Sequence, residues 1–297
     1  MKKQFEKIAV LKGGISSERE VSLRSGAAIA QGLRDGGYDV TEVDVTQKDF
    51  QLSPGVEAVF VALHGTFGED GQIQRILEGR KIPYTGSGAE SCRVAFDKVL
   101  TRQRLEANAI PVPPGEVLQN SKDRKIPVPL VVKPPREGSS VGCHLVFDES
   151  SWAAAFDDAK RYSDDVLVEQ YIPGRELTVG VVDGHALPVV EIQTASDWYD
   201  FEAKYVTGDT RYTVPAELPS ATTEELQSIA LKTFQCLEAE GFGRIDFRLS
   251  PEGKPYVLEL NSIPGFTATS LLPKAASAAG IGFSQLCCQI MELARVK

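Results

Sequence analysis

The sequence predicts a mixed α/β fold, with a parallel sheet near the amino end and an antiparallel element near the carboxyl end. Strand-like and helical segments alternate along 7–63, and a β-α-β order of this kind implies parallel strands. Two apolar-rich runs, 244–250 and 255–261, flank Pro251-Glu252-Gly253-Lys254, which favours a tight connection between antiparallel strands. A length of 297 residues is enough for two domains of average size, at about 150 residues each.

The composition is that of an ordinary globular protein, with 42% hydrophobic residues and a formal net charge of −9. The negative charge argues against nonspecific nucleic-acid binding, although it permits a local pocket for an anionic nucleotide. No apolar run reaches the length of a membrane span, and the amino end lacks the apolar stretch of a secretory signal. Five cysteines without C-x-x-C spacing fit reduced thiols better than disulfides or a zinc site. We therefore expect a cytoplasmic protein with no nucleic-acid or membrane partner.

The first expected elements are a strand over 7–11 and a helix over 21–33. Ser17 and Glu20 stand three residues apart, the spacing of a capping box at the start of a helix. Glu18 would then lie in the first helical turn, at the carboxyl end of a strand, where open α/β sheets bind ligands. An acid that only complements the helix dipole is the alternative interpretation of Glu18.

Two more strands are expected over 38–43 and 58–63, and the second of these leads into the glycine-rich segment 64–71. Three glycines in this segment let the backbone approach a ligand closely or adopt left-handed turns. His64 is its first residue. Because a lone histidine is more often structural than catalytic, we expect His64 to position a substrate carboxylate or the glycine-rich segment rather than to transfer a proton.

The middle of the chain indicates a nucleotide site. A helix over 91–108 is followed by a strand over 130–134 that carries Lys133, and then by the small-residue loop 136–142. The N–H groups of such a loop can cradle phosphate oxygens while a lysine supplies a point charge. The loop does not have the P-loop pattern, and a plain Gly-Ser linker is the alternative.

The apolar run 166–172 is a further expected strand, suited to form the wall of an adenine site. Glu176 follows shortly after it, where its carboxylate can hold ribose hydroxyls. The polar, aromatic segment 197–209 is long enough to be a lid that excludes water from a reactive intermediate. Lys204 and Tyr205 are the expected working residues of this lid, and a mobile surface loop is the alternative.

The carboxyl-terminal hairpin has one chemically loaded face. If its connection closes an antiparallel pair, Asp246 lies opposite Glu259, and Arg244 lies opposite Asn261. Two carboxylates and an amide oxygen on one patch are ligands of the kind that Mg²⁺ takes together with substrate phosphates. An ordinary hairpin with a solvated polar face is the alternative, although two acids directly opposite each other would then repel. The other face is expected to carry the apolar residues Ile245, Phe247, Leu249, Tyr256, Leu258 and Leu260.

These segments together resemble the ATP-grasp superfamily and, within it, the D-alanine–D-alanine ligases of bacterial cell-wall synthesis. The resemblance covers essentially the whole chain and rests on four motifs in order, GGISSEREVSLRSG, HGTFGEDG, KPPREGSSVG and GRIDF…LELNSIPG. Any one of the motifs is weak, but their joint occurrence is specific. The resemblance implies an ATP-grasp fold with an amino-terminal substrate domain over 1–95, a small central domain over 96–183 and a carboxyl-terminal catalytic domain over 184–297.

The resemblance also implies site residues, position by position. Those implied for ATP binding are Lys98, Lys133, Glu169, Tyr171, Ile172, Glu176 and Lys204. Those implied as ligands of two Mg²⁺ or Mn²⁺ ions are Asp246, Glu259 and Asn261. Those implied for the chemistry are Glu18, Ser139, Tyr205, Arg244 and Gly265, the last two as oxyanion stabilisers. Those implied for substrate binding are His64, Ser270 and Leu271.

The implied activity is ATP-dependent joining of two D-alanines through an acyl phosphate, by a homodimer. The assignment of Ser270 and Leu271 has independent support, because they open an apolar helix through Ala279 and a helix start offers N–H groups to a carboxylate. Two alternatives stay open: a ligase with a different second substrate, such as D-serine, D-lactate or another amino acid, and a nucleotide-binding module without turnover. Five residues depart from the usual pattern, and all but the first two lie near the second-substrate site: Arg75, Arg248, Ala268, Thr269 and Lys274.

Overall fold

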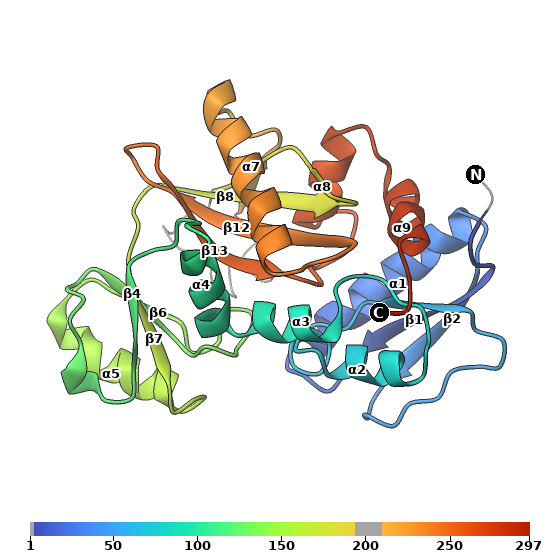
Figure 1. The fold of residues 1–297 in the computed structure, drawn as a ribbon, viewed down its shortest axis with the longest axis horizontal. Coiled ribbons are helices and arrows are strands. Elements are labelled where there is room, and N and C mark those ends of the chain that lie inside the picture. The colour runs from blue at the N-terminus through green and yellow to red at the C-terminus, as the bar shows by residue number, and fades with distance from the viewer. Residues whose placement is uncertain (1–2, 194–209) are drawn as a thin grey trace.

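The computed structural model describes residues 3–193 and 210–297, which form three sheets with helices packed against them (Figure 1). The amino-terminal elements are β1 (Lys7–Gly13), α1 (Arg19–Asp35), β2 (Asp39–Val45), β3 (Ala58–Val61), α2 (Gln72–Gly79), α3 (Ala89–Phe96) and α4 (Lys98–Ala107). The central elements are β4 (Gly115–Leu118), the 3₁₀ turn η1 (Ser121–Asp123), β5 (Leu130–Lys133), β6 (His144–Val146), α5 (Glu149–Lys160) and β7 (Val166–Gln170). The remaining elements are β8 (Arg175–Val182), β9 (His185–Ala186), β10 (Val190–Gln193), β11 (Arg211–Thr213), α7 (Ser220–Cys236), β12 (Phe242–Leu249), β13 (Pro255–Asn261), α8 (Leu271–Ala278) and α9 (Phe283–Glu292).

The amino-terminal sheet is parallel, as the sequence predicts. Its strand order is β2-β1-β3, and both strand pairs run parallel. Tyr84 extends the sheet through an isolated parallel bridge to Val59 and an antiparallel bridge to Arg295 near the end of the chain. All four residues of β3 are buried, which fits a strand of a parallel sheet that is covered on both faces.

The predicted capping box at Ser17 and Glu20 is wrong. Helix α1 begins at Arg19, and its N-cap residue Glu18 makes no side-chain capping hydrogen bond. Instead, Ser16 Oγ accepts a hydrogen bond of 3.2 Å from the Glu18 N–H and donates one of 2.7 Å to the His64 carbonyl oxygen. The Ser16 hydroxyl therefore supports this turn, and the carboxylate of Glu18 is left to face the central domain.

The single helix expected over 91–108 is also wrong, because α3 ends at Phe96 and α4 begins at Lys98. Between them Asp97 has extended dihedral angles, and its carboxylate accepts hydrogen bonds from the N–H groups of Val99 and Leu100. An aspartate that caps a helix in this way starts a new helix axis. The break orients α4, and with it Lys98, toward the central sheet.

The central sheet is antiparallel, with strand order β4-β7-β5-β6 and helix α5 packed on one face. The expected strands over 130–134 and 166–172 are both present as β5 and β7, each one or two residues shorter at the carboxyl end. Residues 171–174 then lead from β7 directly into β8, which belongs to the next sheet.

The described strands of the third sheet pair antiparallel, with order β11-β10-β8-β12-β13 and β9 paired to β8. Its hairpin β12–β13 has the predicted register, with Arg244 opposite Asn261 and Asp246 opposite Glu259. The register shifts just after Asp246 because of a bulge, so Phe247 faces Val257 rather than Leu258.

Because of this bulge, the apolar face predicted for β13 is wrong at Tyr256 and Leu258. Val257 is fully buried in the core between this sheet and α7, whereas Tyr256 and Leu258 are only partly buried and lie outside that core. An extra residue in one strand inverts the alternation beyond it. Leu258 consequently lines the cavity described below.

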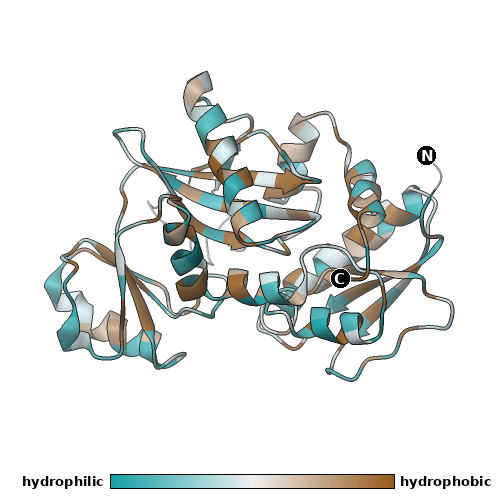
Figure 2. Ribbon diagram, in the orientation of Figure 1, coloured by the Kyte–Doolittle hydropathy of each residue, from teal (hydrophilic) through white to brown (hydrophobic). Residues whose placement is uncertain are grey.

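The chain ends back at the amino-terminal sheet. Helix α9 shares a hydrophobic core with α1, through residues such as Cys287 and Ile290 against Ile29 and Leu33 (Figure 1). Figure 2 shows long apolar stretches along the strands, while the helices alternate between polar and apolar residues as expected for elements with one solvent-facing side. Among residues 3–193 and 210–297 no helix has the length and apolar character that a bilayer crossing requires.

Two sequence expectations stay predictions. The domain boundaries after residues 95 and 183 are not fixed by a break in the structure, and β8 before the second boundary is hydrogen-bonded to β12 after it. The expected lid over 197–209, with Lys204 and Tyr205, lies outside the described residues.

Candidate active site

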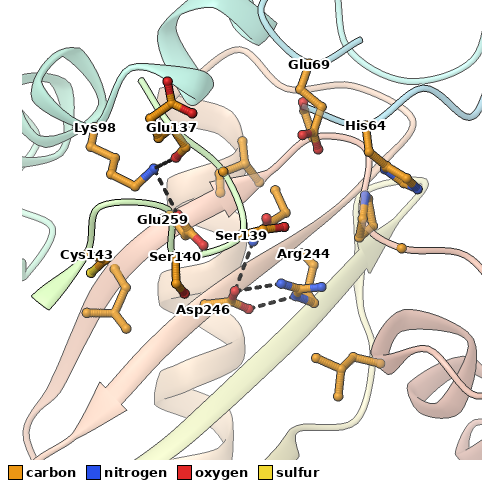
Figure 3. Close-up of a pocket in the computed structure, with 18 of the residues that line it drawn as sticks. His64, Glu69, Lys98, Glu137, Ser139, Ser140, Cys143, Arg244, Asp246 and Glu259 are labelled. Carbon is orange, nitrogen blue, oxygen red and sulfur yellow. Dashed lines mark hydrogen bonds and ion pairs between the residues drawn. The ribbon is translucent and has the colours of Figure 1, made fainter. Parts of the chain in front are cut away.

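One cavity of about 630 Å³ is lined by residues of the central and third sheets, of α1 and of the glycine-rich segment that follows β3 (Figure 3). Every site residue expected from the sequence that the structure describes lines it. These residues are Glu18, His64, Lys98, Lys133, Ser139, Glu169, Tyr171, Ile172, Glu176, Arg244, Asp246, Glu259, Asn261, Gly265, Ser270 and Leu271.

The hairpin supplies one wall of the cavity. Arg244 donates two hydrogen bonds of 2.8 Å to the two carboxylate oxygens of Asp246, a bidentate pair between residues on the same face of β12 (Figure 3). Asn261 Nδ2 donates to Asp246 at 2.9 Å, and the Thr178 hydroxyl on β8 donates to it at 2.6 Å. Asp246 is thus held by four donors in one orientation, with only 9% of its surface exposed.

Glu259 and Lys98 face each other across the cavity. The Lys98 ammonium lies 3.5 Å from the Glu259 carboxylate and donates a hydrogen bond of 2.8 Å to the Glu137 carbonyl oxygen (Figure 3). Lys98 stands at the start of α4, where the Asp97 break directs it. The lysine therefore joins the hairpin wall to the loop that follows β5.

The hairpin donors fit a hard divalent cation. Asp246, Glu259 and Asn261 offer two carboxylates and an amide oxygen on one wall, the donor chemistry that Mg²⁺ and Mn²⁺ take. Within the described part of the chain no group of three or more His, Cys, Asp or Glu side chains is arranged to hold a metal by itself. Ions bound here would therefore need phosphate oxygens or water to complete their coordination, which is usual for nucleotide-bound Mg²⁺.

A second buried ion-pair group lies at the end of β5. Lys133 contacts Glu169 on β7 at 2.6 Å, and Arg102 on α4 contacts the other carboxylate oxygen of Glu169 at 3.3 Å. Burial is the largest single influence on the pKa of Lys133 and lowers it, but the charge and hydrogen bond of Glu169 together with the nearby Cys143 and Glu259 raise it by more, so the pKa is raised. Lys133 therefore carries a positive charge into the cavity, and Glu169 holds it from the strand side.

The loop after β5 closes over Glu18. Ser139 and Ser140 have positive φ angles of 49° and 61° and form the corner of a turn in which the Val141 N–H donates to the Gly138 carbonyl at 3.0 Å. The Ser139 hydroxyl donates a hydrogen bond to the Glu18 carboxylate. A Cβ at Gly138 would lie 2.8 Å from the same carboxylate, so a side chain at this position would displace the Glu18 carboxyl group. The contact expected between Glu18 and Ser139 is therefore present.

His64 has no free ring nitrogen. Its Nδ1 lies 3.0 Å from the Ile263 carbonyl oxygen, and its Nε2 lies 3.0 Å from the Ser25 hydroxyl, which accepts a hydrogen bond from the Phe266 N–H. Burial lowers its pKa to about 4, so the ring is neutral near pH 7. The network is satisfied when Nδ1 carries the proton and Ser25 donates to Nε2. His64 thus positions the segment 263–266, which contains Gly265, rather than the glycine-rich segment 64–71.

Glu69 belongs to the site, although sequence reasoning gave it no role. It is partly buried in the lining of the cavity, where the Gly65 N–H donates to its carboxylate at 2.7 Å. Burial raises its pKa well above the ordinary value, and the nearby charge of Glu18 adds to the effect. Glu69 stands five residues after His64, in the glycine-rich segment at a sheet edge, and this position could have indicated from the sequence that it belongs to the site.

The start of α8 forms the end of the cavity where the sequence predicts the second substrate. Ser270 is the N-cap residue, and its hydroxyl accepts a hydrogen bond of 2.9 Å from the Thr267 N–H. Lys274, one turn into the helix, places its ammonium 5.2 Å from the ring centre of Tyr212 on β11. The expected helix over 270–279 is thus present, with its amino end directed at the cavity.

Comparisons with known proteins agree with this arrangement. A family model described as "D-ala D-ala ligase C-terminus" matches residues 100–292, and one described as "D-ala D-ala ligase N-terminus" matches residues 47–87. The chain is 46% identical to a D-alanine–D-alanine ligase of Syntrophotalea carbinolica, covering 99% of this chain and 98% of the relative. It is 45% identical to one of Methylacidiphilum infernorum, covering 98% of this chain and 96% of the relative.

Solved structures agree as well. The crystal structure of a D-alanine–D-alanine ligase from Bacillus anthracis matches with a TM-score of 0.85 and 33% identity, covering 97% of each chain. The same enzyme complexed with ATP matches with a TM-score of 0.82 and 30% identity, also over 97% of each chain. The expected ATP-grasp fold is confirmed, and this chain belongs to the D-alanine–D-alanine ligase family.

Proposed function

We propose that this protein is an ATP-dependent ligase that joins two D-alanines into D-alanyl-D-alanine, for peptidoglycan precursor synthesis. The observation that carries the proposal is the cavity itself, in which two buried or half-buried lysines face a hairpin wall of two carboxylates, an amide and an arginine. Family membership over nearly the whole length supports it.

The first step activates a carboxylate. A free carboxylate is a poor acyl donor because oxide would have to leave, so the first D-alanine attacks the γ-phosphorus of ATP. The new O–P bond gives D-alanyl phosphate, and ADP leaves. Lys98 and Lys133 offset charge on the phosphoryl oxygens, and positioning plus charge stabilisation is where catalysis of phosphoryl transfer mainly lies.

The second step forms the peptide bond. The amine of the second D-alanine attacks the acyl carbon of D-alanyl phosphate, and inorganic phosphate leaves. Arg244 and the Gly265 N–H stabilise the tetrahedral oxyanion, and donors of this kind are each worth about 3–4 kcal/mol of barrier. The proton lost by the amine passes to the neighbourhood of Glu18 and Ser139, to which Tyr205 of the lid contributes.

Substrate binding uses the two ends of the cavity. Glu18 meets the ammonium group of the first D-alanine. The amino end of α8 at Ser270 and Leu271 receives the carboxylate of the second D-alanine, because a helix start offers unpaired N–H groups and the positive end of its dipole. His64 acts by holding the segment 263–266 against the cavity.

Metal ions and the nucleotide share the hairpin. Asp246, Glu259 and Asn261 would hold two Mg²⁺ or Mn²⁺ ions, which supply positive charge to the phosphoryl oxygens when bound. Tyr171 and Ile172 contact adenine, Glu176 holds the ribose, and Glu169 supports Lys133. Lys204 of the lid contacts the phosphates. A homodimer in the cytoplasm, where ATP is available, completes the proposal.

The test is a phosphate-release assay with purified protein, ATP and Mg²⁺. D-alanine is expected to trigger release of one phosphate per dipeptide formed, with the product identified by mass spectrometry, while L-alanine triggers none. Competition between D-alanine and equimolar D-serine or D-lactate then identifies the second substrate. Phosphate release that no D-amino acid stimulates would overturn the proposal.

A further inference from the structure

A short crossing segment, residues 171–174, connects the central sheet to the third sheet and lines the cavity at the expected adenine end. It leaves β7 at Tyr171 and reaches β8 after Gly174. Gly174 has a φ of 116°, and a Cβ there would lie 2.1 Å from the Leu249 carbonyl oxygen at the end of β12. The segment is therefore pressed against β12, and its conformation depends on what β12 presents to it.

β12 presents Arg248, which is 8% exposed. Arg248 lies directly opposite Glu176 across the β8–β12 pair, and it shares a face with Arg244 and Asp246 because side chains alternate along a strand. Its guanidinium lies 3.3 Å from the Glu176 carboxylate. The nucleotide-facing acid is thus paired with a cation from the neighbouring strand.

The same guanidinium also holds the crossing segment. Arg248 Nε donates a hydrogen bond of 3.0 Å to the Ile172 carbonyl oxygen, and Nη2 donates one of 3.2 Å to the Tyr171 hydroxyl. Its Cζ lies 5.5 Å from the centre of the Tyr171 ring, within the range of a cation–π contact. On the central-domain side, Phe147 meets the same ring edge-on at 5.6 Å between centroids.

We propose that Arg248 is a positioning residue for the nucleotide, which fixes Tyr171, Ile172 and Glu176 in the arrangement that receives adenine and ribose. This inference rests on the proposed function, because it assigns the nucleotide to this end of the cavity. One guanidinium reaches three acceptors and an aromatic face at once, through its planar fork of donors. A lysine has one nitrogen and cannot reproduce this set, and an apolar side chain supplies none of it.

The chemical consequence is selectivity for a ribonucleotide. A carboxylate held in one rotamer can accept hydrogen bonds from ribose hydroxyls at fixed positions, whereas a mobile one loses part of that free energy to ordering. Removing Arg248 should therefore weaken the binding of ATP more than the binding of 2′-deoxy-ATP. The chemical step, at the other end of the cavity, should be unaffected.

The test compares Arg248→Met, which keeps the length without the donors, with Arg248→Lys and a matched control, Arg175→Met. Like Arg248, Arg175 stands on a strand and pairs with a carboxylate. Its partner is Glu191, to which it donates two hydrogen bonds, and Arg175 does not line the cavity. For Arg248→Met we expect KM for ATP to rise about tenfold, with kcat and KM for D-alanine within about twofold of the wild type. The preference for ATP over 2′-deoxy-ATP should fall on the order of threefold, and Arg248→Lys should lie between the two proteins.

Several results would overturn the inference: unchanged ATP affinity in folded Arg248 variants, a fall in kcat with constant KM for ATP, or an equal effect in Arg175→Met. If Arg248→Met does not fold, Arg248→Lys decides on the same criteria. Calorimetric titration with ATP and Mg²⁺ separates this inference from the proposed function. Wild-type protein that binds ATP without joining D-alanine would refute the ligase, and the titrations of the variants would still decide the role of Arg248.

Discussion

Replacing His64 with glutamine is expected to remove the part of the acid sensitivity of this fold that comes from the buried imidazole ring. His64 is buried, both ring nitrogens are hydrogen-bonded, and burial lowers its pKa from 6.5 to about 4. The unfolded chain binds a proton at this residue below pH 6.5, whereas the folded protein resists it until about pH 4. Stability from the neutral ring is therefore complete above pH 6.5 and is lost as the pH falls toward 4.

The magnitude follows from these two pKa values. At pH 5 protonation of this one histidine stabilises the unfolded state by about 2 kcal/mol relative to the folded state. At pH 7.5 the same effect is close to zero. Unfolding entropies near 2.1 cal/mol/K per residue convert this into a Tm shift of about 3 °C for a chain of 297 residues. The wild-type Tm should thus fall about 3 °C more than the Tm of His64→Gln between these two pH values.

Circular dichroism melts at pH 7.5 and pH 5.0 measure this difference, and any overall destabilisation by the substitution cancels because each protein is its own reference. His144→Gln is the control, because His144 pairs with Asp158 at a half-exposed position on the central domain. That variant should keep the additional acid sensitivity of the wild type. Equal Tm shifts in wild type and His64→Gln would refute the reasoning.

Three further outcomes are expected. Glu259→Ala should lower the turnover rate by a factor of about 10² to 10³ without changing the melting temperature. The control Glu252→Ala, in the exposed hairpin turn, should leave the turnover rate unchanged. A wild-type rate for folded Glu259→Ala at saturating Mg²⁺ would contradict the metal assignment. Glu169→Gln should lower the free energy of unfolding, measured with guanidinium chloride, by about 3–5 kcal/mol, because it leaves Lys133 and Arg102 buried without their shared carboxylate. The control Glu106→Gln, at the exposed partner of Arg102, should lower it by less than about 0.5 kcal/mol. Tyr205→His should shift product from D-alanyl-D-alanine toward D-alanyl-D-lactate near pH 6, because an imidazolium there disfavours a zwitterionic second substrate; equal product ratios by mass spectrometry across pH 6–9 would remove Tyr205 from this choice.

The hairpin shows how far local sequence rules reach. Alternation and loop length correctly place Asp246 opposite Glu259 and Arg244 opposite Asn261. The same rules fail one residue later, because the bulge is decided by the packing of Val257 into the core against α7. Period-two alternation would have placed Arg248 on the site face with Asp246, so that role was accessible from the sequence.

Contacts between distant strands were not accessible. The pairing of Lys133 with Glu169 depends on the strand order β4-β7-β5-β6, which no local pattern specifies. The break at Asp97 likewise reflects a choice between continuing a helix and capping a new one, and the periodicity of 91–108 does not discriminate between them. In both cases the outcome is decided by tertiary packing, which a local sequence pattern does not contain.

The charges of the cavity explain why two acids can face each other on one hairpin. Four carboxylates that line the cavity each lie beside a cation: Asp246 beside Arg244, Glu259 beside Lys98, Glu169 beside Lys133 and Glu176 beside Arg248. The repulsion that would destabilise an isolated hairpin is therefore offset within the site, and the lysines are held close to where phosphates are expected. In the proposed function a phosphate oxygen would take Lys98 and a divalent cation would take the Glu259 carboxylate, so that neither charge is left uncompensated. The pairs Lys133–Glu169 and Arg248–Glu176 have no such exchange to make with a metal, so they act as fixed supports on the central and adenine sides of the same cavity.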